Sequence, residues 1–304
     1  MVKYNSNFWI IGNGFDLAHR LPTTYRDFSN FLCDYNRGLY ETLINGNNMI
    51  WSNVESGLGE LDYDDCISVY LDDIEYDDDY SKAAINMLED LSGVFATLDT
   101  LSENLKEWIL SISIDNVEVN REFENILKGK KNYFLNFNYT NTLVRLYNID
   151  EEDICYLHGS AYEEDVLIMG HNAPFSEDID KENLIKSSAR SRYYSNFCID
   201  DLYAIEYKKQ YIIESLRKDT DKAYNRYEKF FDKLGCIDAI YSYGFSYGNA
   251  DDYYIDKIIS ILNNRDDAKE VVWYVHNYNE ESTKKIFDKI MSLGYLGKLS
   301  KFNC

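Results

Sequence analysis

Short apolar runs in this chain are separated by stretches with the periodicity of helices. The runs cover residues 6–12, 131–137, 154–160, 165–171, 237–246 and 270–277. Most are continuously apolar instead of alternating with polar residues, and this pattern is typical of strands that are buried on both faces. Buried strands separated by helices predict an α/β fold, with a Rossmann-like, mostly parallel sheet covered by helices.

The stretches between these runs carry apolar residues three or four positions apart, as amphipathic helices do. Pro22 stands just before the first of them, so Thr23 or Thr24 is its expected N-cap. Trp51 and Glu55 would share a face of a helix, either as a core Trp beside a paired Glu or as part of a site. We expect helices over residues 23–44, 81–112, 118–128, 139–148, 201–234, 250–262 and 280–293.

Residues 45–130 interrupt the alternation of strands and helices. Nine acidic residues lie between Asp62 and Asp79, and helical stretches follow. We therefore expect residues 1–44 and 131–304 to form a Rossmann-like nucleotide-binding domain, and residues 45–130 to form a mostly helical, acidic insertion. The acidic run is either a solvated surface or a docking surface for a basic partner.

The charge balance limits the partners of the chain. It has 31 Lys and Arg against 53 Asp and Glu, a net charge of -22. Sequence-independent nucleic-acid binding depends on cationic contacts to phosphates, so we expect no nucleic-acid partner. A small anionic ligand stays open, because backbone amides at a helix N-terminus bind phosphate without side-chain charge.

Two further features argue against a secreted, membrane or metal-binding protein. The chain has no apolar run long enough to cross a membrane and no signal-peptide pattern near its start, so we expect a cytoplasmic protein without a membrane partner. Its six cysteines include no C-x-x-C pair, so we expect neither a zinc site nor a disulfide framework.

Short polar motifs follow the ends of the predicted strands. In an open α/β sheet, ligands bind outside the carboxyl ends of the strands, so motifs there indicate a shared pocket. The motifs are GNGFD (12–16), NFNYT (136–140), LHGS (157–160), MGHN (169–172), YGFSYG (243–248) and HNYN (276–279).

The first motif resembles a phosphate-binding turn. Gly12 and Gly14 allow close approach of a phosphate, and backbone amides from Gly12 to Phe15 would point at it. The third glycine of G-x-G-x-x-G is replaced by Leu17, which disfavours a hydride-transferring dehydrogenase. The alternative is a tight turn without a ligand, although Asn13 and Asp16 add polar groups that such a turn does not need.

The other motifs supply candidate catalytic and binding groups. Asn138 and His158 together form a minimal hydrolytic pair of one amide and one titratable base, although each is also common in purely structural turns. His171 is a weaker candidate of the same kind. Gly244 and Ser246 precede a helix and suit a phosphate, and Asn277 suits a ribose hydroxyl; the alternative for both motifs is a plain turn or helix cap.

Taken in order, the motifs resemble the AbiH family of bacterial phage abortive-infection proteins over nearly the whole chain. The resemblance rests on IIGNGFDLAHRLPTTYRDF, WSNVES, NFNYTNTLVRLY, LHGS, LIMGHN and YGFSYGNADDYYIDKI. This family in turn is distantly similar to the sirtuin-like NAD-binding fold. The positions that match the sirtuin-like pattern are Gly12, Gly14, Pro22, Asn138, His158, Gly159, Gly244, Ser246 and Asn277.

The resemblance implies that the chain binds NAD, or a related nucleotide, and hydrolyses it to nicotinamide and ADP-ribose. It implies catalytic roles for Asn138 and His158, and Thr140 stands where the sirtuin-like pattern has Asp, so Asp16 is the candidate to replace that carboxylate. The four-cysteine zinc module of deacylating sirtuins is absent from the sequence, and the proposed chemistry requires no cofactor beyond NAD as substrate or ligand.

Two alternatives remain open at this point. The first is a nucleotide-binding sensor without turnover, which Thr140 favours, and the second is a hydrolase of another nucleotide that uses both His158 and His171. The sequence also leaves open a homo-oligomer and a phage-derived trigger as further partners.

Overall fold

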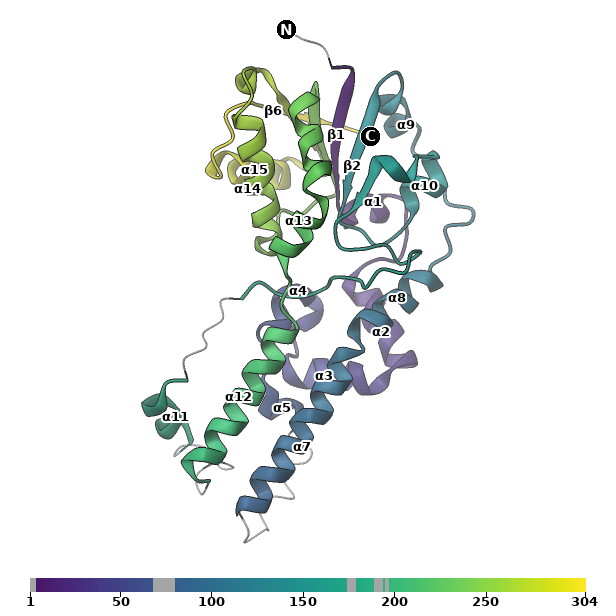
Figure 1. Ribbon diagram of the computed structural model, residues 1–304. Coiled ribbons are helices and arrows are strands. Elements are labelled where there is room, and N and C mark those ends of the chain that lie inside the picture. Colours follow the sequence, from purple (N-terminus) through teal and green to yellow (C-terminus); the bar gives the residue numbers. More distant parts are fainter. Residues whose placement is uncertain (1–3, 68–79, 174–178, 189–193, 195–196) are drawn as a thin grey trace. The chain divides into compact units, whose positions relative to one another are not determined.

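The computed structural model describes residues 4–67, 80–173, 179–188, 194 and 197–304 (Figure 1). The chain divides into two compact units. Unit 1 comprises Met1–Thr24, Leu105–Ile168 and Asp219–Cys304, and unit 2 comprises Tyr25–Asn104 and Met169–Lys218. This division differs from the predicted domains, because residues 25–44 and 169–218 group with the helical unit, and residues 105–130 group with the sheet.

Unit 1 contains a six-stranded parallel sheet, which confirms the predicted fold class. The strands are β1 Ser6–Ile11, β2 Lys131–Asn136, β3 Ile154–Tyr156, β4 Ala239–Tyr243, β5 Val272–His276 and β6 Lys298–Phe302. Their order in the sheet is β3-β2-β1-β4-β5-β6. The direction in which strands are added reverses between β1 and β4, and ligands of doubly wound sheets bind at such a switch point.

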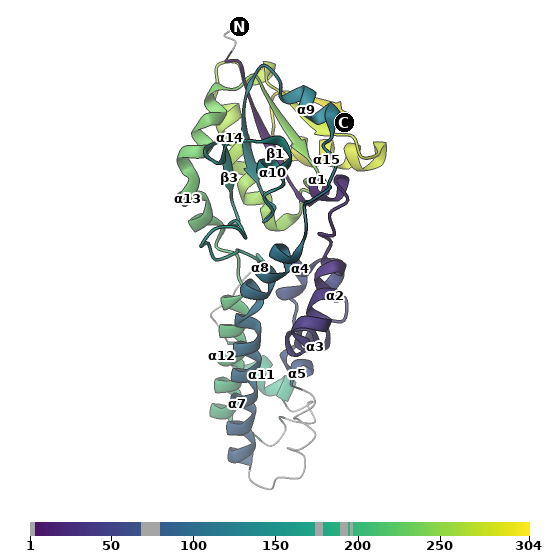
Figure 2. The same ribbon diagram turned by 90° about the vertical axis from the view of Figure 1, so that its right-hand side faces the viewer.

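Helices cover both faces of the sheet. Alternate residues of each strand point to opposite faces, and in β1 both sets are buried. Phe8 and Ile10 of β1 belong to one core and Trp9 and Ile11 to the other. The first core includes residues of α13 Thr220–Phe231, α14 Asp252–Asn263 and α15 Glu280–Ser292. The second includes residues of α1 Asn13–Ala18, α9 Arg121–Leu127 and α10 Thr142–Tyr147 (Figures 1 and 2).

The described part of unit 2 is helical. Helix α7 packs against α12, and α3 contacts α2, α5 and α7. The elements are α2 Tyr25–Tyr35, α3 Arg37–Gly46, η1 Ile50–Ser52, α4 Val54–Leu58, α5 Tyr63–Cys66, α7 Tyr80–Asp99, α11 Lys181–Ser188 and α12 Ile199–Ser215, while α8 Leu101–Ser111 spans the boundary at residue 105. Among the described residues, no helix is both long and apolar enough to span a membrane.

Three predicted helices are each divided in two, and the helix expected over residues 81–112 breaks at Thr100 between α7 and α8. The helix expected over residues 23–44 ends at Tyr35, and Asn36 then caps α3 by accepting from the Leu39 N–H. The helix expected over residues 201–234 stops at Ser215, and Asp219 caps α13. At Asn36 and at Asp219 a side chain that accepts from the backbone starts a new helix within a continuous helical pattern.

Two strand predictions also need correction. Residues 165–171 form no strand; the Ile168 N–H donates to His158 O, and His171 forms an isolated parallel bridge with Arg217, in which its N–H donates to Leu216 O and its carbonyl accepts from the Lys218 N–H. Conversely, β6 was not anticipated, because Lys298–Phe302 at the sheet edge is only partly buried and has a weak apolar pattern. Residues 68–79 of the predicted acidic run lie outside the described residues, and Asp62 caps α5.

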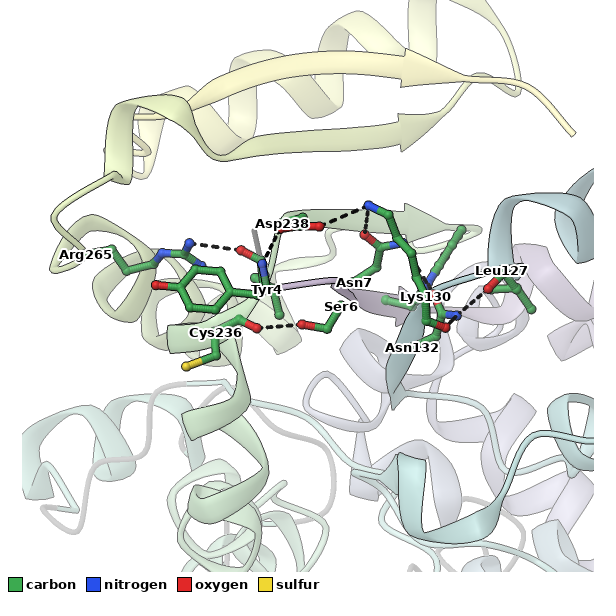
Figure 3. A network of polar contacts seen from close by, with 11 residues as sticks. Tyr4, Ser6, Asn7, Leu127, Lys130, Asn132, Cys236, Asp238 and Arg265 are labelled. Atoms are coloured by element: carbon green, nitrogen blue, oxygen red, sulfur yellow. Dashed lines mark hydrogen bonds and ion pairs between the residues drawn. The ribbon is translucent and has the colours of Figure 1, made fainter. Parts of the chain in front are cut away.

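A polar network ties together the amino ends of β1, β2 and β4 (Figure 3). The Asn132 side-chain oxygen accepts from the Trp9 indole N–H at 2.9 Å and from the Asn7 amide at 3.4 Å. Lys130 contacts Asn7 and also pairs with Asp238, each at 3.3 Å. Because buried polar groups of the central strand find partners here, this edge of the sheet has a structural role.

Candidate functional site

The turns after β1 and β4 touch each other through their backbones at the switch point. The Gly12 N–H donates to Tyr243 O at 3.0 Å, and the Gly14 N–H donates to Gly244 O at 2.9 Å. A Cβ on Gly14 would lie 2.6 Å from the Gly244 Cα, and a Cβ on Gly244 would lie 2.1 Å from the Phe15 nitrogen. Gly244 also has a φ of +68°, which glycine adopts most readily.

These contacts explain why glycine occupies positions 12, 14 and 244, and the sequence alone did not reveal this reason. The Phe15 N–H donates to Gly12 O, so three amides of the predicted phosphate cradle are bonded within the chain. Asn13 is exposed, and its side-chain amide donates to Thr23 O at 2.7 Å. The glycines therefore permit a close approach of two turns in this structure, and their contact with a phosphate stays a prediction.

A buried carboxylate lies beside these turns. Asp16, in α1, is 1% exposed, and each of its two carboxylate oxygens accepts from a threonine hydroxyl. Thr140 donates to Oδ2 at 2.7 Å and Thr142 donates to Oδ1 at 2.8 Å. Position 140, where the sequence resemblance predicts Asp, therefore carries a hydroxyl that holds a carboxylate from another strand end.

The environment of Asp16 changes its ionisation. Burial raises the pKa of Asp16 from 3.8 to about 6, although hydrogen bonds from Thr140 and Thr142 lower it. A carboxyl group with a pKa near neutrality can gain or lose a proton at a low free-energy cost under ordinary conditions. Perturbed carboxylates of this kind cluster at functional sites, and Asp16 lies at the edge of the sheet where ligands bind.

Asn138 follows β2 and joins its turn to the turn after β1. Its side-chain amide donates to Gly12 O at 3.1 Å, and its backbone N–H donates to the Asn136 side chain at 3.1 Å. Asn138 is 7% exposed. The structure therefore places Asn138 beside the glycine turn, as expected for one site, with its amide already bonded to the chain.

His158 follows β3 and lies in an aromatic environment. Its ring packs edge-on against Phe137 at a centroid distance of 5.2 Å and lies 5.9 Å from the ring of Tyr254. The imidazole Nε2 is 3.8 Å from the carboxylate of Asp251, which precedes α14. This distance is too long for a hydrogen bond and suits an ion pair when the histidine is protonated.

The structure thus gathers most of the predicted groups at adjacent strand ends. Asp16, Thr140 and Asn138 connect the turns after β1 and β2, and Gly244 connects them to β4. Phe137 touches Phe245 of the β4 turn at a centroid distance of 4.4 Å, and it also touches the ring of His158.

Two predicted residues of unit 1 take less central positions. Ser246 is exposed, in the turn after β4. Asn277, at the end of β5, donates to the Asn303 side chain and accepts from the Thr283 hydroxyl, both at 3.1 Å. The bond from Thr283 closes the turn that leads into α15, and the bond to Asn303 ties this turn to the segment after β6, so the alternative interpretation of Asn277 as a turn residue fits its contacts.

His171 lies in unit 2, and both of its ring nitrogens are bonded there. Nδ1 accepts from the Ala173 N–H at 3.1 Å, so Nε2 carries the proton and donates to Ile213 O at 2.9 Å. Trp51 and Glu55 do not share a helix, because Asn53 separates η1 from α4.

Three residues that the sequence patterns did not single out take part in these contacts. Thr142 binds Asp16, Asp251 faces His158, and Lys218 pairs with Glu55 at 2.8 Å through a side chain with no exposed surface. Thr142 and Asp251 were predicted only as ordinary helix or cap positions. The T-x-T pattern at 140–142 is the one local signal that could have revealed the second hydroxyl.

Comparison with known families agrees with the order of the motifs. A family model described as bacteriophage abortive infection AbiH matches residues 8–286 of the chain. No curated protein and no solved structure matches it. Among the described residues, no group of three His, Cys, Asp or Glu side chains is arranged to hold a metal ion.

Proposed function

The chain belongs to the AbiH family of bacteriophage abortive-infection proteins, and we propose that it acts in this defence by hydrolysing NAD to nicotinamide and ADP-ribose. The observation that carries the proposal is the buried Asp16 carboxylate, held by Thr140 at the carboxyl ends of β1 and β2, next to the switch point between β1 and β4. This is the edge at which doubly wound sheets bind nucleotides. The carboxylate also restores the group that Thr140 replaces.

The chemistry of N-glycosidic cleavage suits a small set of groups. Nicotinamide leaves NAD as a neutral base, so the leaving group needs no acid, and the transition state resembles an oxocarbenium ion. Orientation of the ribose and of a water molecule then supplies much of the acceleration, together with negative charge near the developing cation. In this proposal Asp16 provides that charge, and Asn138 orients the ribose and the water.

His158 is the proposed proton acceptor. It takes a proton from the ribose or from the attacking water while the bond from water oxygen to the ribose carbon forms and the bond to nicotinamide breaks. Asp251, 3.8 Å from Nε2, stabilises the resulting imidazolium. A positioned base typically contributes about 10²–10⁴-fold to the rate.

A second candidate is a nucleotide-binding sensor without turnover. It is favoured by the hydrogen bond from the Asn138 side chain to Gly12 O, because this bond engages the amide that the enzyme would use to orient the ribose. A hydrolase that pairs His158 with His171 has less support, because both ring nitrogens of His171 are already engaged.

The deciding experiment incubates the purified full-length chain with NAD and follows nicotinamide release by chromatography. We expect release by the wild type and a loss of about 100-fold or more in Asn138→Ala and His158→Gln. Asn125→Ala, on the exposed side of α9, is the matched control and keeps full activity. Equal turnover in all four proteins would reject the catalytic roles of Asn138 and His158.

A binding measurement separates the sensor from the enzyme. Calorimetric titration with NAD and with ADP-ribose is run on the same preparations. Binding of either ligand without nicotinamide release, both alone and in an extract of phage-infected cells, favours the sensor. Absence of both binding and release under these conditions contradicts the assignment of NAD.

A further inference from the structure

Asp16, Thr140 and Thr142 form a closed ring of polar contacts. Thr140 and Thr142 lie 2.7 and 2.8 Å from the two oxygens of Asp16, and their own hydroxyl oxygens are 3.1 Å apart. None of the three residues is more than 2% exposed. The ring is therefore a buried network in which the partners of each group come from the chain.

Counting hydrogens shows what this ring can hold. Each hydroxyl has one hydrogen. When Asp16 is ionised, both hydroxyls donate to it, and the contact between the two threonines carries no hydrogen. When Asp16 is protonated, its new O–H donates to Thr140, the Thr140 hydroxyl turns to Thr142, and Thr142 still donates to the other carboxylate oxygen. All three contacts are then hydrogen bonds.

We propose that Thr142 is a positioning residue of this site, because it completes a ring that keeps the Asp16 carboxyl group in one orientation in both protonation states. Thr140 alone would hold one oxygen and leave the other buried without a donor. Thr142 supplies the second donor to the ionised form, and it supplies the acceptor that the Thr140 hydroxyl needs in the protonated form. The sequence pattern indicated no role for Thr142 beyond the first residue of a helix.

The groups around the ring do not titrate in the same way as Asp16. Tyr156 and Tyr162 lie within electrostatic reach, and burial together with nearby negative charge, including Asp16, raises the pKa of both. His19 follows Asp16 in the chain; burial lowers its pKa, and its ring binds Phe15 O and the Tyr147 hydroxyl. Tyrosines with a raised pKa stay neutral at neutral pH. A titration midpoint in this neighbourhood that lies above the range of ordinary carboxyl groups is therefore expected from Asp16.

The test measures the titration of Asp16 directly. Carboxyl carbons of aspartate are labelled with ¹³C, and Asp16→Asn identifies the resonance. Burial raises the pKa of Asp16 to about 6 in the wild type. We expect Thr142→Val, which has the shape of threonine without its hydroxyl, to move the midpoint upward by about one pH unit, and Thr142→Ser to restore it.

The titration of the Thr142 variants can overturn the proposal in two ways. An unchanged midpoint in Thr142→Val, or a serine variant that behaves like valine, overturns the proposal. If the valine variant does not fold, the wild type still decides: the Thr142 hydroxyl proton should be protected from exchange and change its chemical shift at the Asp16 midpoint. A freely exchanging hydroxyl contradicts the ring.

The link to catalysis rests on the proposed function and is measured separately. We expect Thr142→Val to shift the acidic limb of the pH profile of NAD hydrolysis upward by the same amount as the midpoint, while a simple loss of folded protein would lower activity equally at every pH. A protein that titrates as expected but never cleaves NAD would reject the proposed function and leave the positioning role of Thr142 intact.

Discussion

The Thr140 hydroxyl donates a hydrogen bond of 2.7 Å to the Asp16 carboxylate, although the two residues are 124 positions apart in the sequence. The bond joins the turn after β1 to the turn after β2, which are neighbouring strands of the sheet. The resemblance noted in the sequence predicts a carboxylate at the position of Thr140. The carboxylate is present at this edge of the sheet, but it comes from Asp16.

Asp16→Asn should stabilise the protein at neutral pH. The pKa of Asp16 is raised by burial to about 6, so the folded chain binds the proton more tightly than the unfolded chain. This contribution is fully present below about pH 4 and is lost as the pH rises through about 6. A difference of about two pH units corresponds to about 3 kcal/mol.

Urea unfolding of both proteins at pH 4.5 and 7.5 measures this effect. We expect the asparagine variant to gain most of the 3 kcal/mol at pH 7.5 and little at pH 4.5, and to lose NAD hydrolysis. An equal destabilisation at both values would show that Asp16 contributes through packing and not through its charge.

Gly244→Ala should destabilise unit 1 strongly. The new Cβ would lie 2.1 Å from the Phe15 nitrogen, and the residue has a φ of +68°. Overlap with backbone cannot be relieved by a change of rotamer, so we expect a loss of about 3 kcal/mol or more.

Gly129→Ala is the matched control for this substitution. Gly129 has a φ of +76°, but a Cβ at this position would meet no atom of the described, non-adjacent residues within 4 Å. Only backbone strain of about 1 kcal/mol is expected there. Similar melting temperatures for the two variants would contradict the close approach of the two turns.

Substitution of Glu55 and substitution of Lys218, the two partners of a buried ion pair, should have different free-energy costs. The Lys218 side chain has no exposed surface, whereas 18% of the Glu55 side chain is exposed. Glu55→Gln removes the negative charge beside a buried ammonium and should cost about 3–5 kcal/mol. Lys218→Met leaves a carboxylate that still reaches water, so its cost should be smaller.

A double-mutant cycle measured by chemical unfolding tests this order. The variant with both Glu55→Gln and Lys218→Met should recover much of the loss, because it removes both charges together. A double variant as unstable as the sum of the two single ones would indicate that the charges do not interact.

Asn132→Leu should destabilise the amino edge of the sheet (Figure 3). The substitution removes the acceptor of the Trp9 indole N–H, which is fully buried, and should cost about 1–3 kcal/mol. Lys130→Met removes a partly exposed pair with Asp238 and should cost less than about 1 kcal/mol. Thermal unfolding of the two variants gives the comparison, and a larger loss for Lys130→Met would contradict the assignment.

Much of unit 1 could be predicted from local pattern. The apolar runs of β1, β2, β4 and β5 are buried in the sheet, and the helices near residues 252–263 and 280–292 begin and end close to their predicted bounds. Helix breaks at Asn36 and at residues 216–219 were missed. The helical pattern of the sequence continues through both positions. Each break depends on a capping side chain, and tertiary packing decides how much that cap stabilises the start of a new helix.

The candidate site was predicted only in part. The motifs identified the turns that meet at the carboxyl edge, including Gly12, Asn138 and Gly244. They did not identify Thr142, because a threonine at the first position of a helix is ordinary. They also did not reveal that the glycines accommodate each other, since a glycine pattern looks the same whether a phosphate or a second backbone approaches it.

By itself the sequence determined the α/β class, the burial of the main strands, the family and the placement of polar motifs at strand ends, because these follow from local periodicity and spacing. Only the tertiary structure decided the strand order and the division into two units. It also decided that Asp16 meets Thr140 and Thr142. Such pairings depend on contacts between residues more than a hundred positions apart, and a local pattern reports that a residue is buried without reporting which residue it meets.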